Sequence, residues 1–222
     1  KIKALSSHHM CSVVRELEGI DIYPIYFVRH PIVRARSVYN FERRQPEQTP
    51  GSKYAKQHDF TAYVKWRMLP DVNATIRDYQ VRYCLPRRYE RGPLDEPMFK
   101  QAMDVMGESG LLGVVDRYDE SAVVFEEALR DAFPKIDLSY VIQNVGINKG
   151  GISVEKESKE ILKSLDSLGD QLLEQNKFDL KMYAYGNECL NMKISKIQGY
   201  DLKLADFRAR CHSLSAATGE GV

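Results

Sequence analysis

The feature that most constrains the fold is an apolar run of β-branched and aromatic residues that ends at an arginine. Ile22–Val28 reads Ile-Tyr-Pro-Ile-Tyr-Phe-Val, which predicts a buried strand with Pro24 near its start. The turn Arg29-His-Pro31 follows, and a proline there suits the first turn of a helix, which we predict over Ile32–Arg43. A strand, a tight turn and a helix in this order predict an α/β protein with a parallel sheet.

The composition excludes several classes of protein. The chain has 222 residues, 43% of them hydrophobic, which is enough for one globular domain with a substantial core. A net charge of +1 disfavours a dedicated nucleic-acid binder, and neither a membrane-spanning apolar run nor a signal-peptide pattern is present. The four cysteines form no CxxC pair, and no ligand cluster has the spacing of a metal site, so we expect no bound metal. Buried free thiols are the favoured interpretation of the cysteines, and one or two disulfides in a secretory compartment are the alternative.

The rest of the chain predicts a helix-rich C-terminal half within a single domain, 1–212, followed by a flexible tail, 213–222. A second buried strand is predicted at Gly110–Val115, and a helix over Asp119–Phe133 follows it. Further helices are predicted at Asp59–Met68, Met98–Gly107, Glu155–Gln175, Phe178–Leu190 and, more weakly, Leu202–Leu214. Proline- and glycine-bearing stretches predict loops at Gln45–Ser52, Arg87–Pro97 and Val141–Ile152.

Arg29 and Ser37 are the candidate anion-binding residues. Arg29 lies at the carboxyl end of the first predicted strand, where open α/β sheets bind ligands, and Ser37 lies about two turns into the following helix. A guanidinium group beside a hydroxyl is well suited to bind phosphate, because both donate hydrogen bonds to its oxygens. A purely structural arginine is the alternative at this point.

Four segments resemble sulfotransferases that use 3′-phosphoadenosine 5′-phosphosulfate as donor. Phe27–Ser37 resembles their 3′-phosphate-binding segment, in which the positions of Arg29 and Ser37 grip that phosphate. Gln80–Cys84, Gly113–Ser121 and Asn176–Tyr183 resemble three further family segments, and all four occur in family order. The resemblance is closest to carbohydrate sulfotransferases of the heparan sulfate 2-O type and their bacterial relatives.

The resemblance implies both a fold and an activity. The fold would be a P-loop-kinase-like three-layer domain, with a central parallel sheet of about four or five strands flanked by helices. The activity would be sulfuryl transfer from 3′-phosphoadenosine 5′-phosphosulfate to a hydroxyl, with a carbohydrate as the expected acceptor and adenosine 3′,5′-bisphosphate as the product. Arg34 would support the segment by packing.

The resemblance also implies roles for three residues outside the first segment. His9 lies fifteen residues before Pro24 and matches the histidine expected to act as general base; a surface histidine is the alternative. Arg82 lies in the second segment and would contact the donor. Lys149 lies in a glycine-bearing stretch that resembles the late donor-binding loop, although a plain connecting loop accounts for it equally well.

One family feature, the loop that binds the 5′-phosphosulfate, is not found in this sequence. The stretch Lys1–Met10 has no glycine and no Lys-x-Gly/Ala-x-Thr/Ser pattern. We expect that strand and loop to precede Lys1. The alternative is a non-catalytic, sulfotransferase-like nucleotide-binding module, and a nucleotide kinase of related fold is a third, less favoured reading. The expected compartment is the cytoplasm, with a secretory lumen as the alternative.

Acceptor contacts are predicted only as clusters. Basic side chains in predicted loops could hold an anionic sugar, although a solvated charged surface is the favoured interpretation; they are Arg43, Arg44, Lys53, Lys56, Arg87, Arg88 and Arg91. Tyr63 and Trp66 could stack on sugar rings, but their helical spacing favours core packing. Neither the identity of the acceptor nor the oligomeric state follows from the sequence.

Overall fold

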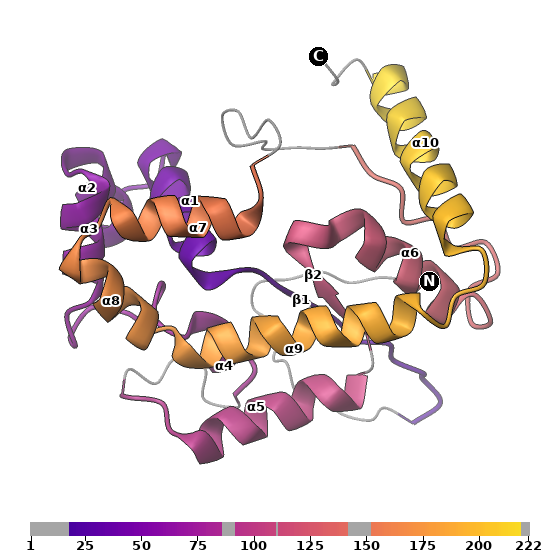
Figure 1. The fold of residues 1–222 in the computed structure, drawn as a ribbon, viewed down its shortest axis with the longest axis horizontal. Helices are drawn as coiled ribbons and strands as arrows, with labels where there is room; N and C mark the ends of the chain where they lie inside the picture. The colour runs from indigo at the N-terminus through magenta and orange to yellow at the C-terminus, as the bar shows by residue number, and fades with distance from the viewer. Residues whose placement is uncertain (1–17, 86–91, 110, 142–151, 219–222) are drawn as a thin grey trace.

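The protein is mostly helical and contains a small parallel sheet. The computed structural model describes residues 18–85, 92–109, 111–141 and 152–218 (Figure 1). The long helix α9 (Lys177–Ile194) runs along the sheet. Helix α10 (Tyr200–Thr218) stands at one end of the molecule, and the group of α1, α2, α3, α7 and α8 forms the other end.

The predicted order of strand, turn and helix is confirmed, although the strand begins at Ile25 and not at Ile22, and only Val28 in it is fully buried. Strand β1 (Ile25–Val28) is followed by α1 (Pro31–Arg44), with proline at the first helical position. Strand β2 (Leu111–Val114) pairs with β1 in parallel, and Val28 lies opposite Val114. These are the two strands of the described residues, where about four or five were expected.

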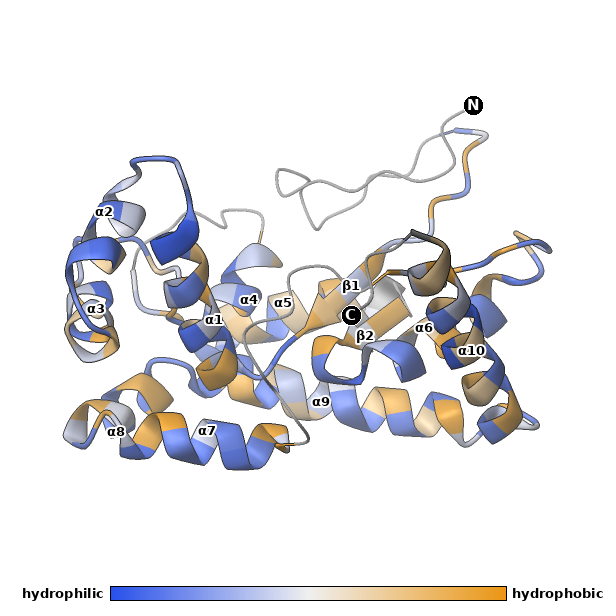
Figure 2. Cartoon of the chain, turned by 90° about the horizontal axis from the view of Figure 1, so that it is seen from above, coloured by the Kyte–Doolittle hydropathy of each residue, from blue (hydrophilic) through white to orange (hydrophobic). Residues whose placement is uncertain are grey.

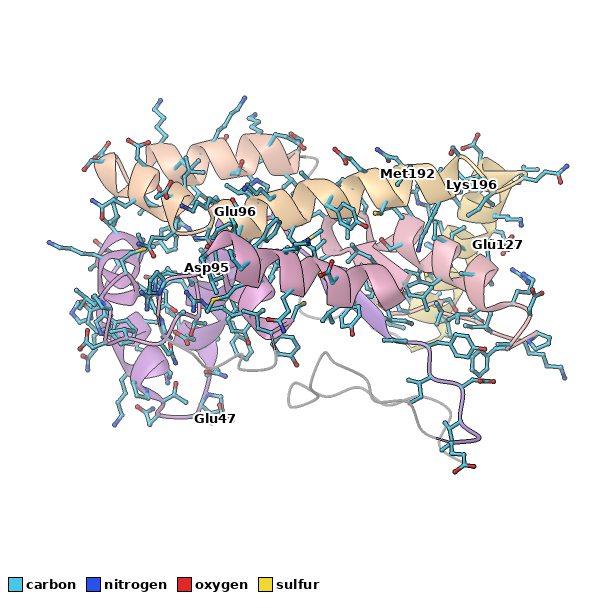
Figure 3. All side chains as sticks on the ribbon, turned by 90° about the horizontal axis from the view of Figure 1, so that it is seen from below. Glu47, Asp95, Glu96, Glu127, Met192 and Lys196 are labelled. Carbon is cyan, nitrogen blue, oxygen red and sulfur yellow. The ribbon has the colours of Figure 1, made fainter. Side chains whose placement is uncertain are left out.

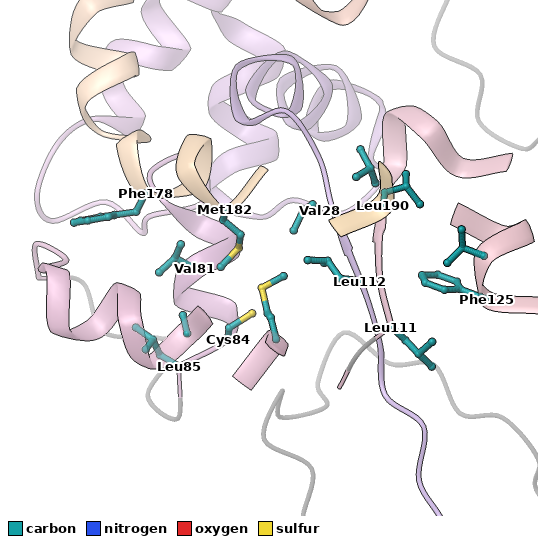
Figure 4. Packing of buried hydrophobic residues seen from close by; sticks show 14 of the residues in the cluster. Val28, Val81, Cys84, Leu85, Leu111, Leu112, Phe125, Phe178, Met182 and Leu190 are labelled. Atoms are coloured by element: carbon teal, nitrogen blue, oxygen red, sulfur yellow. The ribbon is translucent and has the colours of Figure 1, made fainter. Parts of the chain in front are cut away.

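Helices cover both faces of this sheet. On one face, α9 comes so close that a Cβ on Gly186 would lie 2.7 Å from the Val28 side chain. On the other face, the ring of Phe27 meets Phe125 of α6 (Tyr118–Leu129) edge to face, with centroids 5.5 Å apart. Figure 4 shows Met182 and Phe125 on opposite sides of the strands. Strand β2 is buried along its whole length, whereas in β1 only Val28 is fully buried and Ile25 is exposed. Both strands are apolar, as their colour in Figure 2 illustrates.

Two further helices border this core. Helix α5 (Glu96–Ser109) packs beside α9, where the Glu96 carboxylate pairs with the Lys181 ammonium at 2.6 Å (Figure 3). The short helix α4 (Tyr79–Tyr83) buries Val81 in the same core. The single 3-10 turn η1 (Val115–Arg117) joins β2 to α6.

A second core lies at the end of the molecule formed by α1. Four helices pack with α1 here: α2 (Pro50–Gln57), α3 (Phe60–Arg67), α7 (Val154–Lys163) and α8 (Ser167–Glu174). Ile32, Tyr63 and Leu172 are fully buried between them. A third, smaller cluster docks α10 on α6 through Phe207, and Arg210 pairs with Glu126 at 2.8 Å beside it.

Three predicted boundaries were wrong. Gln45–Ser52 is not wholly a loop, since α2 begins at Pro50 and Thr49 caps it by accepting the Ser52 N–H at 3.1 Å. The helix predicted over Glu155–Gln175 is broken at Asp166, whose φ of 48° is incompatible with a continuous helix. Residues 213–218 of the predicted tail 213–222 are helical, because α10 continues through Thr218; residues 219–222 lie outside the described part.

Two absences hold for the described residues. None of the helices there is both long enough and apolar enough to cross a bilayer. In the same part of the chain, His, Cys, Asp and Glu side chains form no group of three or more that could hold a metal ion.

Candidate functional site

The candidate site lies where the two parallel strands end. Val28 and Val114 are paired at the ends of β1 and β2, so the residues that follow them share one edge of the sheet. Arg29 and Asp116 follow the strands, and α1 and α6 begin near the same edge. Ligands of open α/β sheets bind at such edges because loops and helix N-termini converge there.

The structure brings the two predicted phosphate-binding residues together. Arg29 Nη1 donates a hydrogen bond to Ser37 Oγ at 3.0 Å, because the turn after β1 folds α1 back across the strand end. The Arg29 side chain is 26% exposed, so its guanidinium is open to a ligand. Its Nε is buried and has no hydrogen-bond partner in the described residues, which leaves a donor to be satisfied.

Asp116 faces this arginine from the other strand. Its Oδ1 lies 3.8 Å from Arg29 Nε, and its Oδ2 accepts the backbone N–H of His30 at 3.1 Å. The carboxylate therefore orients the turn and offsets part of the arginine's positive charge. It was not predicted as a site residue, although its place directly after the second buried strand was a usable signal.

His30 is neutral in this environment. Burial lowers the pKa of its imidazole, against a smaller opposing effect of the Asp116 charge. Its ring meets Tyr183 edge to face with centroids 5.1 Å apart, and burial together with Asp116 raises the pKa of that tyrosine to about 12. The lowered pKa of His30 and the raised pKa of Tyr183 both favour the uncharged forms of these side chains at neutral pH.

The backbone of Arg29 is held by a side chain from α4. Gln80 Oε1 accepts the Arg29 N–H at 2.7 Å, and Gln80 Nε2 donates to the Arg29 carbonyl at 2.9 Å. These two bonds give the residue beyond the strand end the pairing that a neighbouring strand would give. The sequence placed Gln80 in a recognised segment but did not predict this contact.

Helices α4 and α9, which carry two of the recognised segments, are capped by side chains from each other's N-terminal ends. The Asp179 carboxylate, on α9, accepts the N–H groups of Gln80 and Val81 at 3.0 and 2.9 Å. In return, Asp78 Oδ1 accepts the N–H groups of Phe178 and Asp179 at 3.0 and 2.8 Å. Each carboxylate thus caps the helix to which the other belongs.

This reciprocal capping brings the carboxyl groups of Asp78 and Asp179 close together in a buried position. Burial and the Asp179 charge raise the pKa of Asp78 to about 7. Burial likewise raises the pKa of Asp179, against the hydrogen bonds from Val81 and Gln80. Asn176 adds a further hydrogen bond between the two helix starts, because its Oδ1 accepts the Asp78 N–H at 3.2 Å.

Two further arginines of the recognised segments, Arg34 and Arg82, contact backbone carbonyls. Arg34 Nη1 donates to the Thr75 carbonyl at 2.7 Å, and its guanidinium lies over the Tyr79 ring, in line with the packing role implied for it. Arg82, predicted to contact the donor, is buried on α4 and donates to the carbonyls of Arg77 and Gly92 at 3.2 and 2.8 Å. Arg82 therefore links neighbouring turns through its hydrogen bonds to backbone carbonyls. Arg29 and Ser37, in contrast, are bonded directly to each other.

The remaining predicted residues fall into three groups. His9 and Lys149 lie outside the described residues, as do Arg87, Arg88 and Arg91. Tyr63 is fully buried and bonded to Glu42 and Arg67, whereas Trp66 is partly exposed and stacks on Tyr54 at 4.5 Å. Four basic side chains are exposed on α1 and α2, namely Arg43, Arg44, Lys53 and Lys56.

Comparison with known proteins gives one similar sequence. The chain is 31% identical over 147 residues to an uncharacterized protein of Archaeoglobus fulgidus. The match covers 64% of this chain and 57% of that protein, so the chain spans little more than half of its relative. No family model matches the chain. No solved structure matches it either.

Proposed function

We propose that this protein is a sulfotransferase that takes its sulfuryl group from 3′-phosphoadenosine 5′-phosphosulfate. The observation that carries the proposal is the bond between Arg29 Nη1 and Ser37 Oγ, 3.0 Å long, at the carboxyl end of β1. A guanidinium and a hydroxyl side by side suit a terminal phosphate, whose oxygens can accept hydrogen bonds from both. The order of the four resembling segments supports the same assignment.

The proposal includes the finer fold. We infer a P-loop-kinase-like three-layer domain, of which β1, β2 and the helices on both of their faces would be the part described.

The reaction is an in-line displacement at sulfur. The acceptor hydroxyl oxygen forms a bond to sulfur while the bond from sulfur to the 5′-phosphate oxygen breaks. His9 takes the hydroxyl proton, and adenosine 3′,5′-bisphosphate leaves. Arg29 and Ser37 would hold the 3′-phosphate, and the electrostatic logic is that of phosphoryl transfer. A carbohydrate hydroxyl is the acceptor we propose.

The first test compares two nucleotides that differ by the 3′-phosphate. Calorimetry on the full-length protein should show tighter binding of adenosine 3′,5′-bisphosphate than of adenosine 5′-monophosphate. Arg29→Ala should remove about tenfold to a hundredfold of the bisphosphate affinity, because a charged hydrogen bond contributes about 1.5–3 kcal/mol, and should leave the monophosphate nearly unchanged. Arg130→Ala, at an arginine 53% exposed and paired only along its own helix, is the matched control. Equal binding of both nucleotides by the wild type would refute the phosphate assignment.

The second test separates an enzyme from a binding module. With labelled donor and a panel of hydroxyl acceptors, the wild type should transfer label, and His9→Ala should nearly abolish transfer while still binding adenosine 3′,5′-bisphosphate. Unchanged turnover would remove His9 from the mechanism. Nucleotide binding without transfer to any acceptor class would favour the non-catalytic alternative.

A further inference from the structure

Gln80 makes a two-point contact with a residue 51 positions away. Its amide oxygen accepts the Arg29 N–H at 2.7 Å, and its amide nitrogen donates to the Arg29 carbonyl at 2.9 Å. Arg29 follows Val28, the last residue of β1 that pairs with β2. Within the described residues, the peptide groups of Arg29 are thus held by a side chain and not by a strand.

The orientation of the Gln80 amide follows from its surroundings. Gln80 Nε2 also donates to Asp179 Oδ2, at 3.2 Å. A flipped amide would set its oxygen against both the Asp179 carboxylate and the Arg29 carbonyl, and its NH₂ group against the Arg29 N–H. One arrangement satisfies every group, so the contact is directional.

The helix that carries Gln80 is itself fixed from α9. Asp179 accepts the N–H groups of Gln80 and Val81, and Asp78 caps α9 in return. Asp179 is fully buried, so its position is set by packing and not by solvent. A continuous set of hydrogen bonds therefore runs from α9 through Gln80 to the peptide groups of Arg29 and, through the guanidinium, to Ser37.

We propose that Gln80 is a positioning residue for phosphate binding, acting through the backbone of Arg29. The inference rests on the proposed function, because Arg29 is the residue positioned. Gln80 fixes the N–H and carbonyl on either side of the Arg29 Cα, and these set the direction in which the side chain leaves the strand end. Asp116 fixes the next peptide group, the His30 N–H, at 3.1 Å. The guanidinium is thereby oriented before a ligand arrives.

The test is a double-mutant cycle read on the ratio of two affinities. The ratio of adenosine 3′,5′-bisphosphate affinity to adenosine 5′-monophosphate affinity isolates the 3′-phosphate. Gln80→Leu keeps the side-chain volume but removes the two hydrogen bonds to Arg29 and the one to Asp179. It should reduce this ratio about tenfold while changing monophosphate affinity less than about twofold. In an Arg29→Ala background, the same change should reduce the ratio no further, because Gln80 acts only through Arg29.

The matched control is Asp59→Ala. Asp59 caps α3 by accepting the Ala62 N–H at 2.8 Å. Its loss, like that of Gln80, removes a hydrogen bond from a side chain to a backbone N–H, but at a place without a contact to Arg29. The control should keep the wild-type ratio. If Gln80→Leu does not fold, Gln80→Glu is the second variant. It keeps the acceptor for the Arg29 N–H, loses the donor to the carbonyl and should also lower the ratio.

The possible outcomes distinguish a failure of the positioning role of Gln80 from a failure of the proposed phosphate-binding function. A wild type that does not discriminate the two nucleotides refutes the phosphate assignment, whatever Gln80 does. A wild type that discriminates, with discrimination lost in Arg29→Ala but retained in the Gln80 variants, overturns the positioning role. Equal losses in the Gln80 variant and in Asp59→Ala would also overturn it, because general destabilisation would then explain the effect.

Discussion

Asp78 stabilises the fold through its hydrogen bonds and destabilises it through its buried negative charge. It has a left-handed backbone, with φ of 41°, a conformation that asparagine and aspartate tolerate better than most residues. Its Oδ1 accepts two N–H groups at the start of α9, at 3.0 and 2.8 Å. Its charge, however, is buried beside Asp179, and this raises the pKa of Asp78 to about 7. The acceptor oxygen stabilises the fold, whereas the negative charge opposes it.

We predict that Asp78→Asn removes part of the pH dependence of stability. The pKa is raised in the folded state, so between about pH 4 and pH 7 the folded protein keeps a proton that the unfolded chain has released. The stability contributed by the protonated group is full below about pH 4 and is lost as the pH rises to about 7. Asparagine keeps the acceptor and carries no charge, so the variant should equal the wild type near pH 4 and exceed it near pH 8.

Urea unfolding across this pH range would measure the difference between the two proteins. Asp78→Ala is the control, since it removes the acceptor together with the charge. Its free energy of unfolding should lie below that of Asp78→Asn by about 1–3 kcal/mol at every pH, because the two variants differ in the acceptor oxygen and not in charge. An Asp78→Asn curve that runs parallel to the wild-type curve would contradict the assigned pKa.

At the scale of elements, the close approach of α9 to β1 determines how the sheet packs against the helix that carries Asp179. A Cβ on Gly186 would lie 2.7 Å from the Val28 side chain, and Val28 directly precedes Arg29. Glycine is needed here for close packing and not for an unusual φ. The sheet and the helix that carries Asp179 can therefore lie in direct contact.

We predict that Gly186→Ala destabilises the protein by about 1–3 kcal/mol, the usual cost of overpacking. The displaced Val28 should also weaken adenosine 3′,5′-bisphosphate binding at temperatures where the variant is folded. Gly107→Ala is the matched control, because a Cβ there meets nothing within 4 Å and alanine favours a helix by about 1 kcal/mol. Chemical denaturation and calorimetry would measure both variants. Equal stabilities of the two would refute the close-packing role.

At the scale of the whole molecule, the part of the chain that the structure describes has three apolar clusters, which differ in their relation to the site. The sheet cluster lies directly beneath Arg29, and the α1 cluster supports Ser37. The third cluster, around Phe207, holds α10 against α6. Glu126 reinforces this contact through Arg210 and also accepts the Leu138 N–H at 2.8 Å. The α10 cluster is therefore the one that can be weakened without touching the proposed phosphate site.

We predict that Phe207→Ala loosens α10 and leaves nucleotide binding unchanged. A buried phenylalanine contributes about 3–5 kcal/mol, most of which here docks a single terminal helix. Hydrogen exchange should speed up in α10 and remain slow in α9. Adenosine 3′,5′-bisphosphate affinity should stay within about twofold of wild type. Faster exchange throughout α9 would show that α10 is integral to the main core.

The sequence predicted the parts of the fold whose signal is local. The run Ile22–Val28, the turn with Pro31 and the helix after it were recognised from composition and spacing, as was the second strand. Thr49 followed by Pro50 is also a local helix-start signal, but the glycine and second proline nearby outweighed it. The break at Asp166 had no comparable signal, because aspartate occurs in helices as well as in turns.

The residues of the candidate site also fall into those that local sequence signals predicted and those that only the tertiary structure brought together. Arg29 and Ser37 are eight residues apart across one turn, so the sequence alone determined that they could meet, and they do so at 3.0 Å. Gln80, Asp116 and Asp179 come from three distant segments, and only the tertiary structure decided that they converge around the Arg29 backbone and side chain. The physical reason is that periodicity and propensity act over a few residues. Hydrogen bonds across 50 or more positions form only once packing has brought their elements together.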